Sequence, residues 1–246
     1  MNFSVPPALS KVYMSQKMDS AAFMELGSAH VSDALRACGR AFQAVDAGIR
    51  PIARDMRLAG PAFTVRCYPG ATWALEQAVE LAPAGSVLAV DGGASPDVIL
   101  MGGLMSTRAQ ARGIAGAVLD AAVRDIDDII ELGFPMFSRY ICPRAGTFDK
   151  IGEWETIICI GRVPVRPGDW IVGDSTGVVV VPFEIRQQVL DQARRIAQKE
   201  AKLQPLLRDG KSFSEAAAAA AGTNGEVTAP KSTPTPTTIA PASVDL

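Results

Sequence analysis

The sequence predicts an α/β fold, in one mixed domain with a well-covered sheet and a second half rich in β-strands. Short runs of Val and Ile, bounded by Gly, Pro or Asp, alternate with segments whose apolar residues recur at three- and four-residue steps. Strands of continuous apolar residues are typical of a sheet whose faces are covered by helices. At 246 residues, the chain is long enough to bury its own core without a disulfide or a metal.

Five segments have the pattern of a strand: Gly60–Cys67, Ser86–Asp91, Ile114–Asp120, Pro135–Tyr140 and Gly177–Pro182. Five others have the periodicity of a helix: Val31–Cys38, Ala71–Leu81, Leu104–Arg112, Asp125–Leu132 and Phe183–Leu203. Between residues 141 and 181, glycines and prolines separate several short strands. This spacing favours a compact barrel-like or sandwich-like portion within the same domain.

The composition changes near the end of the chain and divides it into three parts. Residues 1–208 are expected to form the domain that carries the function. Residues 209–221 are rich in Ala and favour a helix, although little in the segment would anchor one. Residues 222–246 contain four prolines, six threonines and almost no large apolar side chains. We expect this tail to be disordered, because it buries too little surface to offset its ordering entropy.

Charge and residue counts exclude several classes of protein. The 24 Lys and Arg residues nearly balance 26 Asp and Glu residues, and the net charge of −2 argues against a nucleic-acid partner. The single histidine, His30, excludes metal sites that need two histidines from one chain. The four cysteines include no C-x-x-C pair, which excludes a zinc ribbon. With no long apolar run and no leader, we expect a cytoplasmic protein with reduced thiols and no membrane partner.

The first candidate site is the segment Asp91–Arg112, where a Gly102-Gly103 pair opens a predicted helix. Glycine permits close backbone approach, and the amides of Leu104 and Met105 would lie unpaired at the positive end of the helix. Such amides suit a carboxylate or a phosphate. The alternative is that the two glycines simply make a tight turn.

The second candidate is the pair Arg124-Asp125, which lies where a buried strand passes into a helix, the usual place for functional groups in open α/β sheets. Arginine can bind a carboxylate and stabilise a developing enolate oxygen. Aspartate can ligate a divalent metal that keeps most of its waters, as Mg²⁺ does. The alternative is that Asp125, Asp127 and Asp128 only complement the helix dipole and that Arg124 is a surface salt-bridge partner.

Two other segments are expected to be structural. In Gly168–Pro182, the residues Ser175-Thr176-Gly177 indicate a hairpin turn, and Asp174 is more typical of a turn residue that accepts bonds from its own backbone than of a catalytic group. His30 lies too close in sequence to Ser32 and Asp33 to form a catalytic triad with them, so we expect it to cap or pack a helix.

Taken in order, several segments resemble the RraA-like family, which includes the class II 4-hydroxy-4-methyl-2-oxoglutarate/4-carboxy-4-hydroxy-2-oxoadipate aldolases and the RNase E inhibitor proteins. The matching segments are HVSDAL (30–35), RLAGPAFTV (57–65), DGG (91–93), GGLMSTRAQARGIAGAVLDAAVRD (102–125) and PGDWIVGDSTGVVVVP (167–182). They cover most of the globular chain, and the block that ends in Arg124-Asp125 is the specific one.

The resemblance implies a β/β/α sandwich around a barrel-like sheet, in a homotrimer or homohexamer with sites at subunit interfaces. It implies that Asp125 ligates Mg²⁺ or Mn²⁺ and that Arg124 binds a 2-keto acid. The substrate carboxylate would lie against the amides of Leu104 and Met105, next to Gly102 and Gly103. Metal and arginine would stabilise a pyruvate enolate, so both pyruvate-releasing aldolase activity and oxaloacetate decarboxylation are expected.

The sequence departs from the family at one position. The family signature is an aspartate, twenty residues and then Arg-Asp, but Gly103 stands where that aspartate would be. In the family this carboxylate holds water in the outer shell of the metal, so Asp97, or Glu200 of a neighbouring subunit, is a candidate substitute. The departure keeps two alternatives open: a non-catalytic protein-binding regulator like the RNase E inhibitors, and an enolate-forming lyase that acts on another 2-keto acid.

Overall fold

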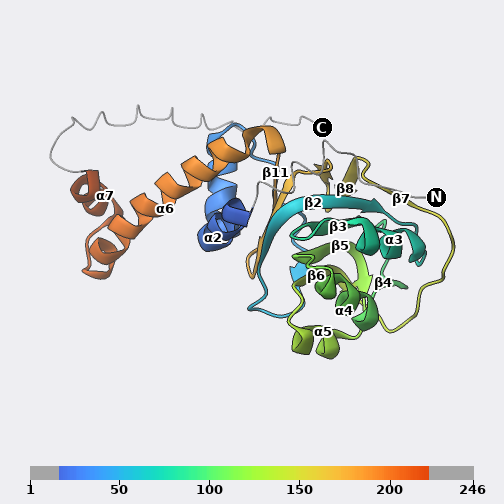
Figure 1. The fold of residues 1–246 in the computed structure, drawn as a ribbon. Helices are drawn as coiled ribbons and strands as arrows, with labels where there is room; N and C mark the ends of the chain where they lie inside the picture. The colour runs from blue at the N-terminus through green and yellow to red at the C-terminus, as the bar shows by residue number, and fades with distance from the viewer. Residues whose placement is uncertain (1–16, 222–246) are drawn as a thin grey trace, which may run out of the picture. The chain divides into compact units, whose positions relative to one another are not determined.

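The computed structural model describes residues 17–221 (Figure 1). The chain divides into two compact units, Met1–Gln198 and Lys199–Leu246. The elements of the first unit are α2 (Lys17–Ala37), β1 (Arg50–Pro51), β2 (Leu58–Arg66), α3 (Trp73–Leu81), β3 (Val87–Asp91), β4 (Ile99–Met101), α4 (Gly103–Ala111), β5 (Gly116–Val123), α5 (Ile126–Leu132), β6 (Met136–Ile141), β7 (Glu153–Trp154), β8 (Ile158–Ile160), β9 (Val163–Val165), β10 (Trp170–Asp174), β11 (Gly177–Val181), the 3₁₀ helix η1 (Phe183–Ile185) and the first part of α6 (Arg186–Arg208).

The α/β fold is confirmed, and one sheet of nine strands organises it. The strands follow the order β1-β6-β5-β3-β2-β10-β11, with β4 beside β5 and β7 beside β2. Pairing is parallel from β2 through β3 and β5 to β6, and antiparallel from β2 through β10 to β11. The strands β8 and β9 form a separate hairpin.

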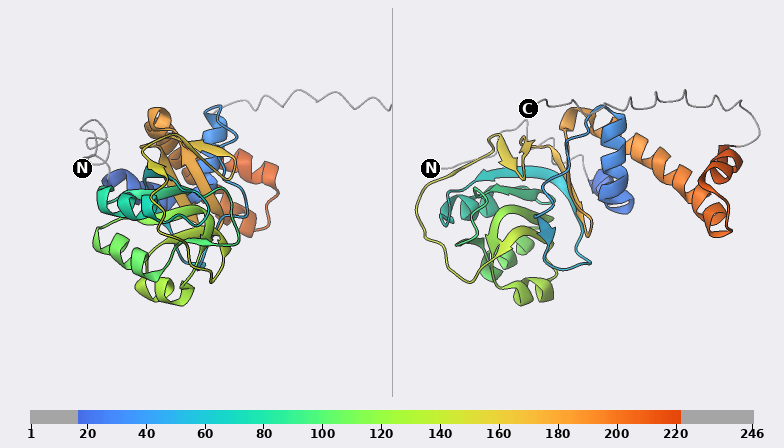
Figure 2. Two further views of the ribbon diagram at one scale, coloured as in Figure 1. Left: turned by 90° about the vertical axis from the view of Figure 1, so that its right-hand side faces the viewer. Right: turned by 180° about the vertical axis from the view of Figure 1, so that it is seen from behind.

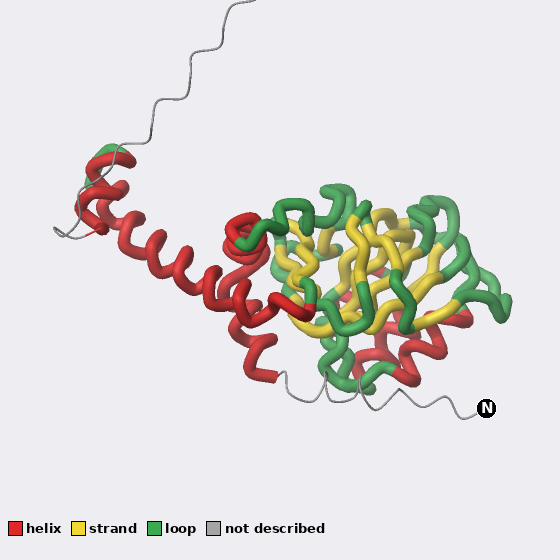
Figure 3. The backbone as a smooth tube through the Cα atoms, turned by 90° about the horizontal axis from the view of Figure 1, so that it is seen from above, coloured by secondary structure: helices red, strands yellow, loops and turns green. Residues whose placement is uncertain are grey.

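One short segment brings the two ends of the sheet together. At one end, β11 exchanges backbone hydrogen bonds of 2.9 Å with Gln43 and Val45. At the other end, Arg50 and Pro51 pair with β6, and the Arg50 guanidinium also donates to the carbonyl of Thr176 in the β10–β11 turn. Because the segment meets both end strands, the sheet is barrel-like and nearly closed, as the family resemblance predicts; the strands curve together in Figure 3.

Two hydrophobic clusters hold helices to the two sides of this sheet. The larger fills the barrel and the layer beneath α3, α4 and α5, with the fully buried strand β5 at its centre. The smaller joins α2 and the start of α6 to β10 and β11, where Phe23 and Trp170 pack with ring centroids 5.3 Å apart. In the right-hand view of Figure 2, α3, α4 and α5 gather on the side of the sheet away from α2. The sequence pattern predicts helices on a covered sheet, because the apolar residues of both clusters recur with the periodicity of helices and strands.

Helix α2 begins 14 residues earlier than the expected Val31, at Lys17, and it is kinked. The kink lies at Gly27, whose φ of 77° is in the left-handed region that glycine adopts without strain. There the Ser28 amide and hydroxyl each donate to the Asp174 carboxylate at 2.7 Å. The periodicity is interrupted at this kink, which is why the first half of the helix was not predicted.

The strands expected between residues 141 and 181 are present, but they do not form a barrel or sandwich of their own. The strands β10 and β11 extend the main sheet through β2, and β7 also pairs with β2. The expectation that residues 141–181 form a compact barrel-like or sandwich-like portion was therefore wrong in its pairing. The reason is that turn residues show where strands end, whereas the partner of a strand depends on contacts distant in sequence.

The second unit contains the end of α6 and the helix α7 (Phe213–Ala221). Ser212 and Glu215 form a reciprocal cap at the start of α7: the Ser212 amide donates to Glu215 Oε2 at 2.8 Å, and the Glu215 amide donates to Ser212 Oγ at 3.3 Å. The expected disorder of 222–246 concerns residues outside the described range. No helix in the described part of the chain is long and apolar enough to cross a membrane.

A largely buried ion network ties the barrel strands to the loop that closes the sheet. Arg139 on β6 donates to Asp120 of β5 at 2.5 Å and to Asp46 of the closing loop at 3.1 Å. The side chains of Arg139 and Asp120 are only 15% and 10% exposed. Asp120 also accepts the Gly161 amide at 2.7 Å, so removing Arg139 would leave a buried carboxylate without its counter-ion.

We predict that Arg139→Met lowers the free energy of unfolding by about 3–5 kcal/mol, because it breaks a buried pair from one side. The matched control is Arg162→Met, since Arg162 also pairs with Asp46 but is 85% exposed. The control should cost less than about 1 kcal/mol. Urea unfolding of both variants measures the difference, and equal losses would contradict the assignment.

Candidate functional site

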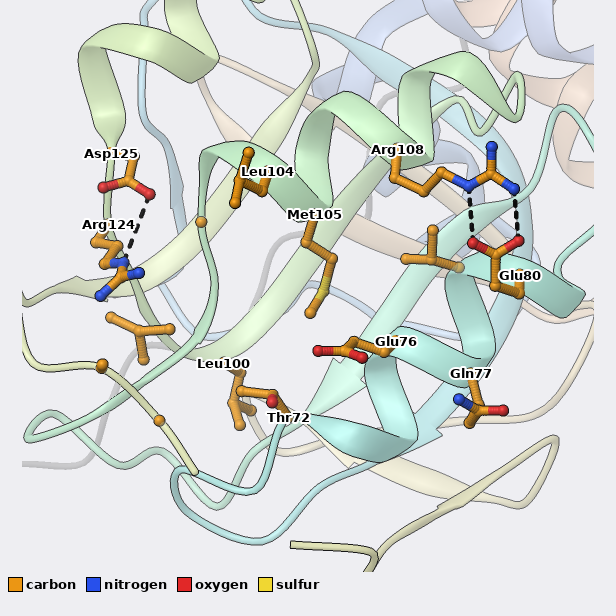
Figure 4. A pocket seen from close by; sticks show the side chains of 15 residues that line it. Thr72, Glu76, Gln77, Glu80, Leu100, Leu104, Met105, Arg108, Arg124 and Asp125 are labelled. Atoms are coloured by element: carbon orange, nitrogen blue, oxygen red, sulfur yellow. Dashed lines mark hydrogen bonds and ion pairs between the residues drawn. The ribbon is translucent and has the colours of Figure 1, made fainter. Parts of the chain in front are cut away.

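A cavity of about 480 Å³ lies beside α3 and α4, and Arg124 and Asp125 form part of its wall (Figure 4). The side chains that line the cavity include Thr72, Glu76 and Glu80 of the α3 segment, Met105 and Arg108 of α4, and the Arg124-Asp125 pair. The two predicted candidate segments, 102–105 and 124–125, are therefore brought together at one cavity. They meet because β4 and β5 are parallel neighbours, so their carboxyl ends lie at the same edge of the sheet.

The Gly102-Gly103 pair allows α4 to approach Asp125 closely. Gly102 is the N-cap of α4, and the Gly103 amide donates to Asp125 Oδ2 at 2.9 Å. A Cβ on residue 102 would lie only 2.7 Å from Asp125 Oδ2. The glycine at 102 therefore does more than turn the chain, because it leaves room for the carboxylate.

Position 103 behaves differently from position 102. A Cβ on residue 103 would meet Asp125 Cβ at 3.4 Å and Asp128 Oδ2 at 3.5 Å, which are ordinary van der Waals distances. A side chain at 103 would thus fit, and it would point among the carboxylates of Asp125 and Asp128. The aspartate that the family carries at this position is absent for a reason other than lack of space.

Asp125 does not cap its own helix, although it is the N-cap residue of α5. Its backbone is left-handed (φ 58°, ψ 44°), a conformation that Asp tolerates better than most residues, and it makes no side-chain cap bond. Its carboxylate instead meets the Gly103 amide and lies 3.5 Å from Arg124 Nε. The alternative of a simple dipole-complementing acid therefore does not describe Asp125.

The Arg124 guanidinium is held at the cavity wall with spare hydrogen-bonding capacity. Its side chain is 40% exposed, and its ion pair is with the adjacent Asp125. Its Nε atom is buried beside Asp125, so the donors left for a ligand are the two terminal Nη nitrogens, which make no hydrogen bond within the described residues. An arginine with free donors at a cavity can bind a planar carboxylate or a keto-acid oxygen.

The acidic residues on α3 lie in two different environments. Glu80 accepts two hydrogen bonds of 2.7 Å from Arg108, and these bonds lower its pKa. Glu76 lies one turn earlier, where burial raises the pKa of its carboxyl group. The only local signal for this face is the spacing of the two glutamates, four residues apart on a predicted helix, and neither residue was among the predicted site residues.

The carboxylates near Asp125 offer oxygen atoms of the kind that a hard divalent cation binds. The nearby ligands are the carboxylate oxygens of Asp125 and Asp128, and among residues 17–221 no group of three or more His, Cys, Asp or Glu side chains is arranged to hold a metal. A cation held by so few protein oxygens would keep several waters, which is the preference of Mg²⁺.

The other predicted residues have varied outcomes. Asp97 is exposed and does not line the cavity. Glu200 belongs to the second compact unit, so its role stays a prediction. Asp174 accepts the Thr176 amide at 2.8 Å within its turn, as expected. His30 Nδ1 contacts the Leu26 carbonyl at 2.6 Å within α2. All four cysteines are free.

Comparison with known proteins gives a consistent result. The family model described as RraA-like, Aldolase/RraA, matches residues 28–180. An uncharacterised protein of Methanocaldococcus jannaschii is 35% identical over 66% of this chain and 79% of its own. A Halalkalibacterium halodurans protein named "Putative 4-hydroxy-4-methyl-2-oxoglutarate aldolase" is 36% identical over 60% of this chain and 70% of its own.

Solved structures show the same relationship. An uncharacterised protein of Pseudomonas syringae pv. tomato superposes with a TM-score of 0.74 at 28% identity, over 89% of this chain and 98% of the other. The RNA-processing inhibitor RraA from Thermus thermophilis gives a TM-score of 0.54 at 28% identity, over 57% of this chain and 85% of the other. The relatives thus include proteins named as aldolases and a protein named as an inhibitor.

We predict opposite effects for alanine at the two glycines. Gly102→Ala should push the Asp125 carboxylate away from the Gly103 amide and lower the free energy of unfolding by about 1.5–3 kcal/mol, the contribution of a hydrogen bond to a charged group. Gly103→Ala has room for its methyl group and should be neutral or stabilising by up to about 1 kcal/mol. Thermal unfolding of both variants tests this, and equal destabilisation would show that Asp125 does not determine the difference.

Proposed function

The chain belongs to the RraA-like family, and from this premise we propose that it is a divalent-metal-dependent aldolase that releases pyruvate from a 2-keto acid. The proposed substrates are of the 4-hydroxy-4-methyl-2-oxoglutarate or 4-carboxy-4-hydroxy-2-oxoadipate type. The same site is proposed to decarboxylate oxaloacetate, because both reactions leave a pyruvate enolate. One observation carries the proposal: Arg124 and the Asp125 carboxylate are fixed side by side at a cavity, each with unused polar capacity.

Different residues of this chain would bind different groups of the substrate and the metal ion. The Arg124 guanidinium would bind the 2-keto acid and counter the negative charge that develops on its enolate oxygen. The amides of Leu104 and Met105, which in the first turn of α4 have no intrahelical acceptor, would bind the substrate carboxylate. Asp125, assisted by the nearby Asp128, would hold Mg²⁺ or Mn²⁺. When bound, that ion would act as a Lewis acid toward the keto group.

A Schiff-base mechanism has no support at this cavity, because no lysine is among the residues that line it. We also propose that the protein acts as a homo-oligomer, a trimer or a hexamer, by analogy with its family. Light scattering coupled to size-exclusion chromatography would test this. A monomer that releases pyruvate would contradict the proposal that the sites need a neighbouring subunit.

The test of the proposed function is a lactate-dehydrogenase-coupled assay for pyruvate. The assay uses oxaloacetate and 4-hydroxy-4-methyl-2-oxoglutarate, each with Mg²⁺, with Mn²⁺ and with EDTA. Release that requires the metal supports the aldolase. A protein that binds its metal but is silent on both substrates would favour the non-catalytic regulator, an alternative supported by Gly103 standing in place of an aspartate.

We predict that Arg124→Ala lowers kcat by about 100- to 1,000-fold on both substrates, because it removes a charge that stabilises the enolate. Arg108→Ala is a matched control, since Arg108 lines the same cavity but is already paired with Glu80. The control should change kcat by less than about tenfold. If the two variants lose the same activity, the loss reflects the shape or charge of the cavity and Arg124 has no special role.

We predict that Gly103→Asp strengthens the binding of Mn²⁺, because the new side chain fits and adds a carboxylate beside Asp125 and Asp128. Isothermal titration calorimetry of the wild type, of Gly103→Asp and of Gly103→Asn separates the effect of charge from that of size. We expect the aspartate variant alone to show at least about tenfold tighter binding, which corresponds to 1.4 kcal/mol. Unchanged or weaker binding in it would argue against a metal at Asp125.

A further inference from the structure

Glu76 has no role in the proposed binding of metal and substrate, although its carboxylate faces the cavity. It belongs to the first turn of α3, whose residues Ala74, Leu75, Ala78 and Val79 are buried against the core. Because these four residues hold one face of α3 against the core, the face that carries Glu76 is turned toward α4 and the cavity. Figure 4 shows the Glu76 carboxylate projecting from α3 into the space beside the Met105 side chain. The carboxylate is thus positioned by rigid elements rather than by a loop.

Glu76 differs from the two other carboxylates that line the cavity because it has no partner. Glu80 is bound by Arg108, and Asp125 accepts the Gly103 amide and lies beside Arg124. Within the described residues, no hydrogen-bond donor or cation pairs with Glu76. A half-buried carboxylate without a partner costs stability, so its presence is not explained by folding.

The charges around the cavity leave Glu76 available for proton transfer. Glu80 on the same helix and Arg108 on α4 also line the cavity, but these two side chains pair with each other. Arg124 and Asp125, at the end of β5, lie on the side toward which the Glu76 carboxylate points in Figure 4. Burial raises the pKa of Glu76, which brings it closer to the range of a working general base.

We propose that Glu76 is the group that transfers the proton in aldol cleavage. Gly103 has no side chain that could take this role. This proposal rests on the proposed function and adds a residue to it. The Glu76 carboxylate takes the proton of the substrate 4-hydroxyl while the C3–C4 bond breaks. The electron pair of that bond becomes the enolate of pyruvate, and C4 becomes a ketone. Glu76 then returns the proton to C3 of the enolate, which yields pyruvate and regenerates the carboxylate without any co-reactant.

The two reactions of the site make different demands on this residue. Aldol cleavage needs a base before the carbon–carbon bond breaks, whereas oxaloacetate loses CO₂ without giving up a proton. Glu76→Gln should therefore lower kcat for 4-hydroxy-4-methyl-2-oxoglutarate by at least about 100-fold. The rate of oxaloacetate decarboxylation by the same variant should fall by less than about tenfold. This selective loss distinguishes proton transfer from general damage to the cavity.

A second readout follows the proton directly. In D₂O with Mg²⁺, the wild type should exchange the methyl protons of pyruvate, because the proton transfer to C3 is reversible, and NMR measures the rate. Glu76→Gln should slow this exchange by about the same factor as aldol cleavage. Its kcat profile should also lose the fall toward low pH that protonation of Glu76 produces in the wild type.

The matched control is Glu80→Gln, which makes the same chemical change one helical turn away, at a carboxylate already paired with Arg108. It should leave exchange and aldol cleavage within about threefold of the wild type. Folding is checked by thermal unfolding. A group whose pKa is raised in the folded state loses stability as the pH rises through that pKa, so at pH 7 Glu76→Gln should melt no lower than the wild type.

The outcomes separate this proposal from the proposed function. If the wild type releases pyruvate but Glu76→Gln cleaves and exchanges as fast, Glu76 is not the proton-transfer group and the aldolase stands. If Glu76→Gln and Glu80→Gln lose the same amount of aldol cleavage and proton exchange, the specific role of Glu76 in proton transfer is also overturned. A wild type that neither releases pyruvate nor exchanges its protons overturns the aldolase and this role together.

Discussion

The parallel pairing of β4 with β5 is the constraint on which the candidate site depends. It places the end of β4, with the glycines that begin α4, next to the end of β5, which carries Arg124 and Asp125. The Arg124 amide donates to the Met101 carbonyl at 3.2 Å, and two residues after Met101 the Gly103 amide donates to the carboxylate of Asp125, the residue that follows Arg124. Residues about twenty positions apart in sequence thus form one polar surface because two strand ends coincide.

The site keeps polar groups in arrangements that the fold alone does not favour. Asp125 has a left-handed backbone, Arg124 Nε is buried without a hydrogen bond within the described residues, and burial raises the pKa of Glu76. Each of these features costs free energy, whereas the surrounding β5 is entirely buried and the Asp120–Arg139 pair is fully bonded. Each kind of cost also occurs elsewhere in the described residues, for example at the left-handed Glu155, at the unbonded Trp170 Nε1 and at the buried Asp169, but at this cavity all three occur together. Their coincidence at a cavity is the pattern expected where binding or catalysis determines the residues.

Local sequence patterns located both candidate segments, but they did not predict features that depend on tertiary contacts. The strand before Arg124 is a continuous apolar run, and the glycine pair is a visible break. The strand β4 has only three residues, too few for a periodicity. The strands β10 and β11 were assigned to a barrel-like or sandwich-like portion because pairing with β2 leaves no trace in local sequence. Glu76 was missed because a glutamate on an amphipathic helix is normally solvated, and only the neighbouring α4 makes it face a cavity.

Gly103 shows how a departure from a family pattern is to be understood physically. The loss of a carboxylate would be a steric necessity if the position were crowded, yet a side chain there would make only ordinary contacts. Nor does the backbone require glycine, since residue 103 lies within the first turn of α4 and is not among the residues with positive φ. A Cβ at 103 therefore has room, and the chain nevertheless has glycine there, while Asp125, Asp128 and Glu76 place carboxylates around the same space. Carboxylates placed where burial and like charge cost free energy are the physical argument for the proposed chemistry at this cavity.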